Sequence, residues 1–198
     1  MKKYELTNDC IQLEGRVTLH RIKALISFET VKAGDLGGYV EKEENLSQTG
    51  NAWVLDDAKV SGNAEVSGDA WVSGNARVFG NARVSGAAEI SGDAWVYGNA
   101  KVSGDAKVSG DAEICRNAHI QCKSDFATVS GFGSFNRNTT FFRCENEEIG
   151  VRCGCFTGNL EEFRKKVKER HRDTVFAKEY LVIADAMESH FQQDQQEE

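Results

Sequence analysis

From Gly50 to Phe126 the chain reads GNAWVL-DDAKVS-GNAEVS-GDAWVS-GNARVF-GNARVS-GAAEIS-GDAWVY-GNAKVS-GDAKVS-GDAEIC-RNAHIQ-CKSDF. An aliphatic residue recurs every six positions from Val54 to Ile120, and Phe126 closes the series. Alanine stands two positions before each aliphatic residue. A short, fixed period of this kind is typical of a solenoid, in which each repeat stacks on its neighbours. A disordered Gly/Asn/Ser linker would not place its valines so regularly.

The alternation of a β-strand explains which side chains face the interior. Residues two apart point the same way, so alanine and valine point inward and the residues beside them point outward. Gly-Asn or Gly-Asp turns each corner, because glycine accepts positive φ and Asn or Asp tolerates it. Three short strands and three corners form a triangular coil of about eighteen residues, and coils stack about 4.8 Å apart. The repeat predicts a little over four such coils.

An aliphatic residue followed four positions later by a small one, as in Val60 to Ala64 and Val66 to Ala70, resembles the left-handed parallel β-helix proteins of the hexapeptide-repeat family. The resemblance covers residues 50–126 and implies the same fold. We therefore predict a mainly β protein: a left-handed parallel β-helix with an N-terminal β cap and a C-terminal β-meander plus two helices.

The segments on either side of the repeat are expected to cover the open ends of the solenoid, since unpaired strand edges invite association. Residues 1–48 form the predicted cap and irregular first coil, 49–126 the β-helix, and 127–198 the C-terminal module. In the cap, residues 10–13 and 17–22 predict a β-hairpin around Glu14-Gly15, and residues 33–40 and 44–47 an irregular coil. Leu46 lies six residues before Ala52 and is expected to start the register.

The C-terminal module is predicted from shorter patterns. Residues 127–133, 138–144 and 149–156 are expected to form strands. Asn159 can cap a helix over 160–170, with Glu161 and Glu162 in its first turn, and a second helix is expected over 173–191.

Two flanking stretches resemble hexapeptide-repeat proteins of bacteria and phages. The first is Leu19-His20-Arg21-Ile22-Lys23-Ala24-Leu25 with Gly34-Asp35-Leu36-Gly37-Gly38-Tyr39-Val40-Glu41 and Asn45-Leu46-Ser47. The second is Ile149-Gly150-Val151-Arg152-Cys153-Gly154-Cys155-Phe156-Thr157-Gly158-Asn159-Leu160. Together these resemblances imply a phage or prophage setting, and they imply no activity.

Charge and composition narrow the class of partner. The 198 residues carry a formal net charge of -7, so there is no basic surface for nucleic acid or anionic lipid. The chain starts Met1-Lys2-Lys3-Tyr4-Glu5 without an apolar leader, and no stretch reaches membrane-spanning length. We expect a cytoplasmic protein, in the host cell if phage-encoded, with neither nucleic acid nor membrane as its partner.

An eighteen-residue coil sorts the outward residues into three faces. Face one carries Trp53, Leu55, Trp71, Ser73, Glu89, Ser91, Lys107 and Ser109; face two carries Lys59, Arg77, Phe79, Trp95, Tyr97, Glu113 and Cys115; face three carries Glu65, Ser67, Arg83, Ser85, Lys101, Ser103, His119 and Gln121. Large aromatic side chains occur on faces one and two, and exposed aromatic clusters mark interfaces.

Three interpretations of these aromatic residues remain open: the flanking segments fold over them, copies of the chain associate through them, or they bind a ligand. Trp53 and Trp71 should lie one above the other, as should Phe79 and Tyr97, with Trp95 beside Tyr97. Many proteins that this fold resembles are trimers, so we predict a homotrimer.

The C-terminal module holds the second group of candidate binding residues. Arg143, Arg152 and Lys165 could meet an anionic partner there, together with Lys166, Lys168, Arg170 and Arg172, the alternative being a solvated helix face. Two corners of the coil stack Asn63, Asn81, Asn99 and Asn117, and Asp57, Asn75, Asp93 and Asp111. Amides in register can hydrogen bond along the stack, and we interpret both rows as structural turn chemistry.

The obvious enzymatic hypothesis is a coenzyme A-dependent acyltransferase. The resemblance to the hexapeptide-repeat family implies it, because enzymes of that family use a general-base histidine beside a coenzyme A groove between subunits. His119 is the one histidine within the coils, where it lies on the polar face three, so it is the one candidate base. The alternative is that His119 is a surface residue without a catalytic role.

No metal and no cofactor is expected. Six cysteines, at 10, 115, 122, 144, 153 and 155, are too few and uneven for a disulfide framework. Cys115, His119 and Cys122 have metal-ligand types but lie on different faces or a corner. Cys153 and Cys155 should share a strand face and could join Cys144 only in one hairpin register.

The sequence thus favours a non-catalytic, oligomeric β-solenoid that acts as a binding or scaffold protein. The phage resemblance leads to a narrower hypothesis, that the protein binds a host protein or sequesters a small nucleotide to counter host defence. The alternative is the acyltransferase.

Overall fold

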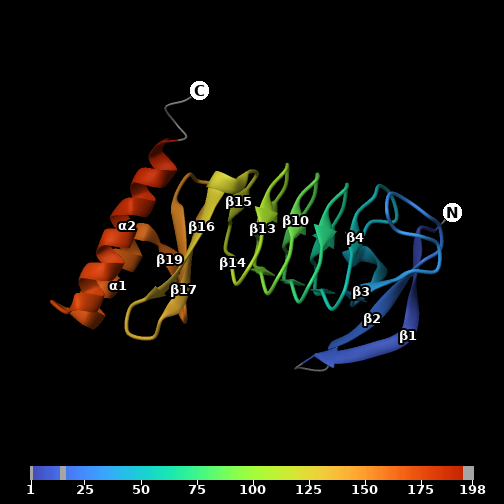
Figure 1. The fold of residues 1–198 in the computed structure, drawn as a ribbon, viewed down its shortest axis with the longest axis horizontal. Coiled ribbons are helices and arrows are strands. Elements are labelled where there is room, and N and C mark those ends of the chain that lie inside the picture. Colours follow the sequence, from blue (N-terminus) through green and yellow to red (C-terminus); the bar gives the residue numbers. More distant parts are fainter. Residues whose placement is uncertain (1, 14–16, 194–198) are drawn as a thin grey trace.

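The computed structural model describes residues 2–13 and 17–193 of the chain. The protein is mainly β: a parallel β-solenoid of about five turns, followed by a separate strand sheet and two helices. Figure 1 shows the coils stacked along the long axis, with the N-terminal hairpin at one end and the helices at the other. The predicted fold class is confirmed.

Each face of the solenoid is a parallel sheet whose strands come from successive coils. Face one is β4 (Trp53–Val54), β7 (Trp71–Val72), β10 (Glu89–Ile90) and β13 (Lys107–Val108). Face two runs from β3 (Leu36–Val40) through β5 (Lys59–Val60), β8 (Arg77–Val78) and β11 (Trp95–Val96) to β14 (Glu113–Ile114). Face three is β6 (Glu65–Val66), β9 (Arg83–Val84), β12 (Lys101–Val102) and β15 (His119–Ile120).

The period that the sequence predicts is the period of the strand pairing. Trp71 pairs with Glu89 and Glu89 with Lys107, eighteen residues apart at each step. The repeat alanines and valines between Ala52 and Ile120 are at most 1% exposed. These small and branched side chains therefore form one continuous interior column.

The corners depend on positive φ and on close approach between coils. Gly86 has φ +66°, and a Cβ there would lie 2.9 Å from the backbone nitrogen of Gly104 in the next coil. Asp56 and Arg116 occupy the glycine position at two corners, with φ of 53° and 60°. An unbroken corner row of glycine is thus a steric consequence of stacking, and the departures fall where the repeat begins and ends.

The two polar corner rows differ. In one row an amide of each coil donates to the next, from Asn63 to Asn81 (3.2 Å), Asn81 to Asn99 (3.1 Å) and Asn99 to Asn117 (3.2 Å). In the other row Asn75 donates to Asp93 (2.9 Å), and Asp111, one coil further, accepts from Asn138 of the C-terminal module (2.8 Å).

The N-terminal cap closes the first coil. Strands β1 (Tyr4–Leu13) and β2 (Val17–Ala24) form the predicted antiparallel hairpin, whose turn at residues 14–16 lies outside the described residues. The β2 strand pairs with β3, so the hairpin extends face two. Lys3, 2% exposed, donates to the carbonyl oxygens of Ala52 (2.8 Å) and Gly50 (3.3 Å), and thereby satisfies acceptors at the solenoid edge.

The register of the first coil differs from the prediction. Leu46, which follows the short 3-10 turn Glu43–Asn45, bridges Val66, twenty residues later. Leu46 therefore occupies a valine position rather than the alanine position that its spacing from Ala52 predicted. The first coil is two residues longer than the others.

The C-terminal sheet is antiparallel and consists of β16 (Phe126–Phe132), β17 (Arg137–Arg143), β18 (Ile149–Cys153) and β19 (Phe156–Asn159), after a 3-10 turn at Lys123–Asp125. The single strand predicted over 149–156 is wrong. It is two strands joined at Gly154, whose φ of +58° reverses the chain. Cys153 and Cys155 accordingly do not share one strand face.

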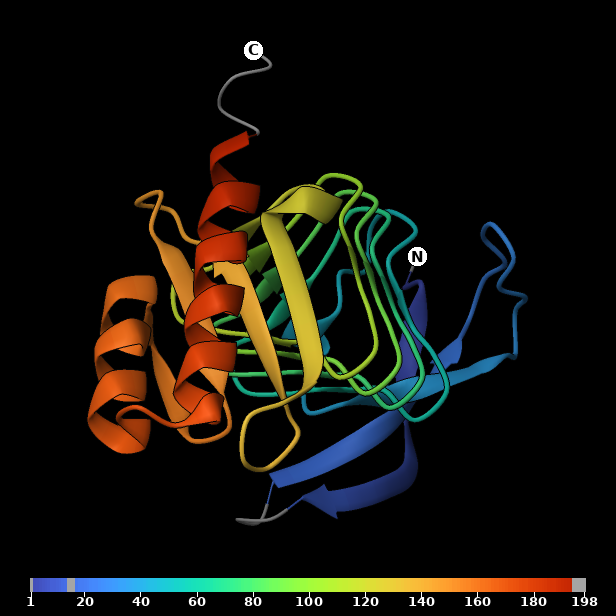
Figure 2. The ribbon, with the colours of Figure 1, turned by 60° about the vertical axis from the view of Figure 1, so that its left-hand side comes forward.

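Two helices cover the outer side of this sheet, as Figure 2 shows. Helix α1 (Leu160–His171) starts at Asn159, whose side chain accepts from the Glu162 backbone while Glu162 caps Asn159 in return. Helix α2 (Val175–Gln193) packs against α1. Both predicted helices are confirmed.

Strand β17 separates two hydrophobic cores. Phe142 packs into the solenoid interior, and its neighbour Phe141 packs with Phe163 and Tyr180 of the helices. Alternation along one strand thus closes the last coil on one side and supports the helices on the other. Cys144 belongs to the solenoid core, whereas Cys153 packs against the helix core, so these two thiols do not meet.

Candidate functional site

Face two carries an aromatic cluster made of Phe79, Trp95 and Tyr97. The Phe79 and Tyr97 rings, one coil apart, stack with centroids 4.9 Å apart and an interplanar angle of 1°. Trp95 lies edge-on to Phe79 at 6.0 Å and is 37% exposed. The predicted superposition of Phe79 and Tyr97 is confirmed, and the face keeps a large indole at its surface.

Arg77, one coil before Trp95 on the same face, extends this cluster. Its guanidinium lies 4.7 Å from the Trp95 ring centroid and 5.7 Å from that of Phe79. A cation over an aromatic face is attracted by the ring quadrupole, so Arg77 helps to hold an indole that remains partly exposed. We call Arg77, Phe79, Trp95 and Tyr97 the aromatic surface.

A groove lies where the aromatic surface meets the C-terminal module. Its volume is about 510 Å³, and Phe135 on its module side is 62% exposed. The other side chains are carboxylates of the last coils and polar groups of the β16–β17 turn; its lining is Asp93, Trp95, Asp111, Glu113, Phe135, Asn136, Arg137, Asn138 and Gly154.

The last coil is joined to the module at Glu113. Arg152 of β18 donates to Glu113 (2.7 Å), and Tyr97 donates to the same carboxylate (3.3 Å). Burial, followed by the neighbouring Cys115 thiol, raises the pKa of Tyr97 above its ordinary value. Tyr97 is therefore a neutral hydrogen-bond donor at physiological pH, and Arg152 fixes the module on face two.

Face one retains less exposed aromatic surface than its sequence suggested. Trp53 is 1% exposed, because Tyr4 and Phe28 of the cap pack edge-on against its indole at 6.1 and 5.5 Å. Trp53 and Trp71 are register partners, as predicted. Trp71 is half-buried and packs against the core. For Trp53 the covering of an aromatic residue by a flanking segment is the interpretation that holds.

His119 lies half-buried on β15, and its register partner on face three is Lys101. Lys101 forms an ion pair with Glu145, which follows β17, and that hydrogen bond lowers the pKa of the Glu145 carboxyl. The neighbouring Ala118 bridges Cys144. The candidate base therefore belongs to the join between the last coil and the module.

The three cationic residues predicted to meet an anion are not brought together. Arg143 donates to Asp125 (3.0 Å) and to the carbonyl oxygen of Phe191 (3.2 Å), so it ties α2 to the last coil. Arg152 holds Glu113 as described above. Lys165 is exposed on α1 beside a shallow depression lined in part by Phe156 and Thr157.

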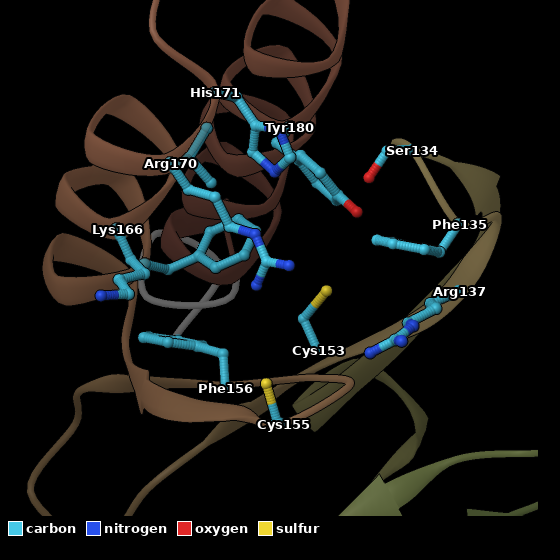
Figure 3. A pocket seen from close by; sticks show the side chains of 12 residues that line it. Ser134, Phe135, Arg137, Cys153, Cys155, Phe156, Lys166, Arg170, His171 and Tyr180 are labelled. Atoms are coloured by element: carbon cyan, nitrogen blue, oxygen red, sulfur yellow. The ribbon is translucent and has the colours of Figure 1, made fainter.

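A pocket opens inside the C-terminal module, between the β16–β17 and β18–β19 turns and the two helices (Figure 3). Its volume is about 70 Å³. Cationic, aromatic and thiol side chains line it together; the set is Ser134, Phe135, Arg137, Cys153, Cys155, Phe156, Phe163, Lys166, Val167, Arg170, His171 and Tyr180. Lys166 and Arg170 belong to the wider cationic set noted in the sequence.

Hydrogen bonds and burial shape the floor of this pocket. Thr139 donates to the sulfur of Cys153 (3.1 Å). Tyr180 is 7% exposed and Phe163 3%. Burial, followed by Cys153, raises the pKa of Tyr180 to about 12. The phenol therefore stays protonated and can donate a hydrogen bond.

Sequence reasoning missed Arg77, Arg137 and Tyr180. Arg77 was assigned to face two, and its spacing from Trp95 signalled the contact. Arg137 and Tyr180 are separated by a hairpin and a helix, and only the packing of α2 on the sheet brings them together.

Within residues 2–13 and 17–193, no group of three or more His, Cys, Asp or Glu side chains is placed to hold a metal ion. In the same part of the chain, no helix is long and apolar enough to cross a membrane.

The repeat and the fold define the class. Residues 70–86 and 76–92 match the YdcK β-solenoid repeat. With the parallel coils and their eighteen-residue register, this match supports a hexapeptide-repeat β-helix protein.

One relative can be named. The chain is 35% identical over 77 residues to the uncharacterised acetyltransferase YdcK of Escherichia coli K12. The matched stretch covers 32% of this chain and 24% of that protein, so the chain spans about a quarter of the relative's length.

Proposed function

We propose that this protein is a non-catalytic β-solenoid scaffold that binds another protein through the aromatic surface on face two. The observation that carries the proposal is Trp95, which stays 37% exposed although Arg77 and Phe79 hold its indole from two sides. Tryptophan, tyrosine and arginine are the residues most enriched at the energetic centres of interfaces.

The groove beside Trp95 supports a protein partner rather than a small molecule. It is wide and open, at about 510 Å³, and both of its walls present exposed rings. Carboxylates of Asp93, Asp111 and Glu113 line it, so a partner segment that carries a lysine or arginine side chain would complement it.

Self-association is part of the proposal. We infer a homotrimer whose chains pack side by side with face two in the interface, since Trp53 of face one is covered by the cap. A partner protein that binds the same face would replace a neighbouring copy of the chain. The phage resemblance of residues 19–47 and 149–160 supports a scaffold that acts in the host cytoplasm. The partner that we propose is a host protein that takes part in host defence, and binding to the scaffold would counter that defence.

Light scattering and native mass spectrometry test the assembly. The expected mass is three times the chain mass of 21.8 kDa. Trp95→Ala should shift the distribution towards the single chain, and Arg83→Ala on face three should leave it unchanged. A single-chain mass at every concentration would remove the trimer. An unaffected trimer in Trp95→Ala would remove face two as its interface.

Partner binding is tested separately by placing a photo-crosslinking amino acid at position 95 or at position 83. The expected result is a cross-linked host protein from position 95 that also binds the purified chain with Trp95 intact and is lost in Trp95→Ala. Binding of that purified protein with equal affinity to both variants would overturn the proposed surface.

The second candidate is a coenzyme A-dependent acyltransferase, which the similarity to YdcK favours. His119 would serve as its general base, with a neighbouring subunit completing the coenzyme A groove. Thermal unfolding with acetyl-CoA separates the two functions, because a ligand that binds the folded state raises Tm. A rise that disappears in His119→Ala would favour the enzyme, and no rise favours the scaffold.

A further inference from the structure

We propose that the pocket of the C-terminal module binds a small organic anion, with a phosphate or carboxylate attached to a flat aromatic ring. The pocket lies between the turns of the sheet and helices α1 and α2 (Figure 3), and none of Arg77, Phe79, Trp95 and Tyr97 lines it. Phe135 and Arg137 line both this pocket and the groove, but Arg170 lines only the pocket and Trp95 only the groove, so Arg170→Gln and Trp95→Ala test the two proposals independently.

The charge of the lining points to an anion. Arg137, Lys166 and Arg170 line the pocket with His171, and none of the lining residues is a carboxylate. Lys166 pairs with Glu169 at 3.6 Å, but within the described part of the chain neither Arg137 nor Arg170 forms a salt bridge. Two guanidinium groups without a counter-ion at one cavity favour a bound oxyanion, which they can contact in bidentate geometry.

The two arginine side chains converge from opposite walls. Arg137 comes from β17 and Arg170 from α1, and Figure 3 shows both guanidinium groups turned towards Cys153. Both also act electrostatically on the Tyr180 phenol. The protonated Tyr180 adds a neutral donor to the same region. The three groups provide the donors that a phosphate or carboxylate needs.

The volume of the pocket and the aromatic rings at its mouth indicate what the ligand carries besides the anionic group. A cavity of about 70 Å³ has room for one small head group, so the remainder must lie at the mouth. Phe135, 62% exposed, and the partly exposed Phe156 line the opening. Arg137 lies 4.8 Å from the Phe135 ring centroid, and the large exposed fraction of Phe135 leaves surface on which a second ring can pack. A ligand with a flat ring gains this stacking, and an inorganic ion does not.

The matching experiment is calorimetric titration of the full chain with phenyl phosphate, benzoate, inorganic phosphate and phenol. Phenyl phosphate or benzoate should bind at least about tenfold more tightly than inorganic phosphate, a difference of about 1.4 kcal/mol that one stacked ring can supply. Phenol should not bind measurably. Arg137→Gln and Arg170→Gln should each weaken binding by about tenfold or more.

Lys168→Gln is the matched control, because Lys168 is exposed on the same helix as Arg170, outside the pocket lining, and the substitution removes the same charge. It should leave the affinity within about twofold. Unchanged Tm values of the unliganded variants show that both arginine substitutions keep the fold. The proposal is overturned if neither ring anion binds, if inorganic phosphate binds as tightly, or if Lys168→Gln weakens binding as much as Arg170→Gln.

Discussion

The repeat and the C-terminal module solve the same packing problem in different ways. In the repeat every coil contributes the same inward alanine and valine, and the charged side chains form short pairs along a face, such as Glu89 with Lys107. In the module one strand, β17, serves two cores, and cationic side chains surround a cavity. The pocket of the module thus lies where the repetition has ended.

In the coils, the residues that determine the fold are different from those that a partner would contact. The outer residues of a coil can change without altering the interior, which makes the repeat a frame for whatever its faces present. The core of the module does not repeat, and in it Phe163 contacts both Phe141 and Tyr180. A change in its core should therefore affect the pocket and spare the coils.

The largest effect that tests this separation is expected from Phe163→Ala. The ring contacts Phe141, Phe156 and Tyr180 at centroid distances of 5.5 to 6.0 Å, and its removal leaves a cavity that costs about 3–5 kcal/mol. Hydrogen exchange should show faster exchange over residues 126–193 and unchanged protection in the coils. Val84→Ala is the control, because this substitution should reduce the protection from hydrogen exchange throughout the coils. Equal loss in both regions after Phe163→Ala would mean that the two cores unfold as one.

A smaller effect is expected at the opposite end, from Lys3→Met. The substitution keeps the length of the buried chain but removes the donor to Ala52 and Gly50, at a cost of about 1.5–3 kcal/mol. Thermal unfolding and exchange in residues 4–54 measure it. Loss of protection confined to the C-terminal module would contradict the assignment.

The same lysine predicts a pH dependence of the cap. Burial lowers the pKa of Lys3 from 10.5 to about 8, so between these values the unfolded chain binds more protons than the folded one. The free energy of unfolding of the cap should therefore increase with pH between about 8 and 10.5, and it should not change with pH below about 8, where Lys3 is protonated in both states. Hydrogen exchange in the cap between pH 7.5 and 9.5, corrected for intrinsic rates, should lose this slope in Lys3→Met.

The smallest effects are expected from exchanging the two corner rows. Asn81→Asp removes a donor to Asn99 and adds a charge, so we expect a loss of about 0.5–1.5 kcal/mol. Asp93→Asn keeps the acceptor for Asn75 and adds a donor towards the next coil, so it should gain about 0.5 kcal/mol or more. Chemical denaturation measures both. Changes of the same sign would show that the rows do not act as hydrogen-bonded ladders.

How far the sequence predicts the structure depends on which of these regions is considered. Spacing alone identifies the inward residues, the three faces and the contact between Phe79 and Tyr97, because one geometric rule governs every coil. The rule fails at Leu46, since a longer first coil changes its partner from the expected position to Val66. It also fails at Gly154, where one residue with positive φ divides the expected strand.

The candidate site was less predictable than the fold. The cationic residues could be listed, but Arg143 and Arg152 are used to hold elements together, as Asp125 and Glu113 accept from them. The pocket residues Arg137 and Tyr180 come together only through long-range packing of a hairpin against α2. No periodic signal exists for a contact of that kind, so residue type alone could not select the right arginines.

Because the cross-section is triangular, the number of hexads sets both the distance and the relative orientation of the two ends of the solenoid. Inserting a whole coil of about eighteen residues would move the N-terminal hairpin about 4.8 Å further from the groove and keep both on the same face. Inserting a single hexad would instead rotate the module by one face and set the groove over a different edge. Lengthening during evolution should therefore proceed in steps of three hexads wherever a partner touches both ends.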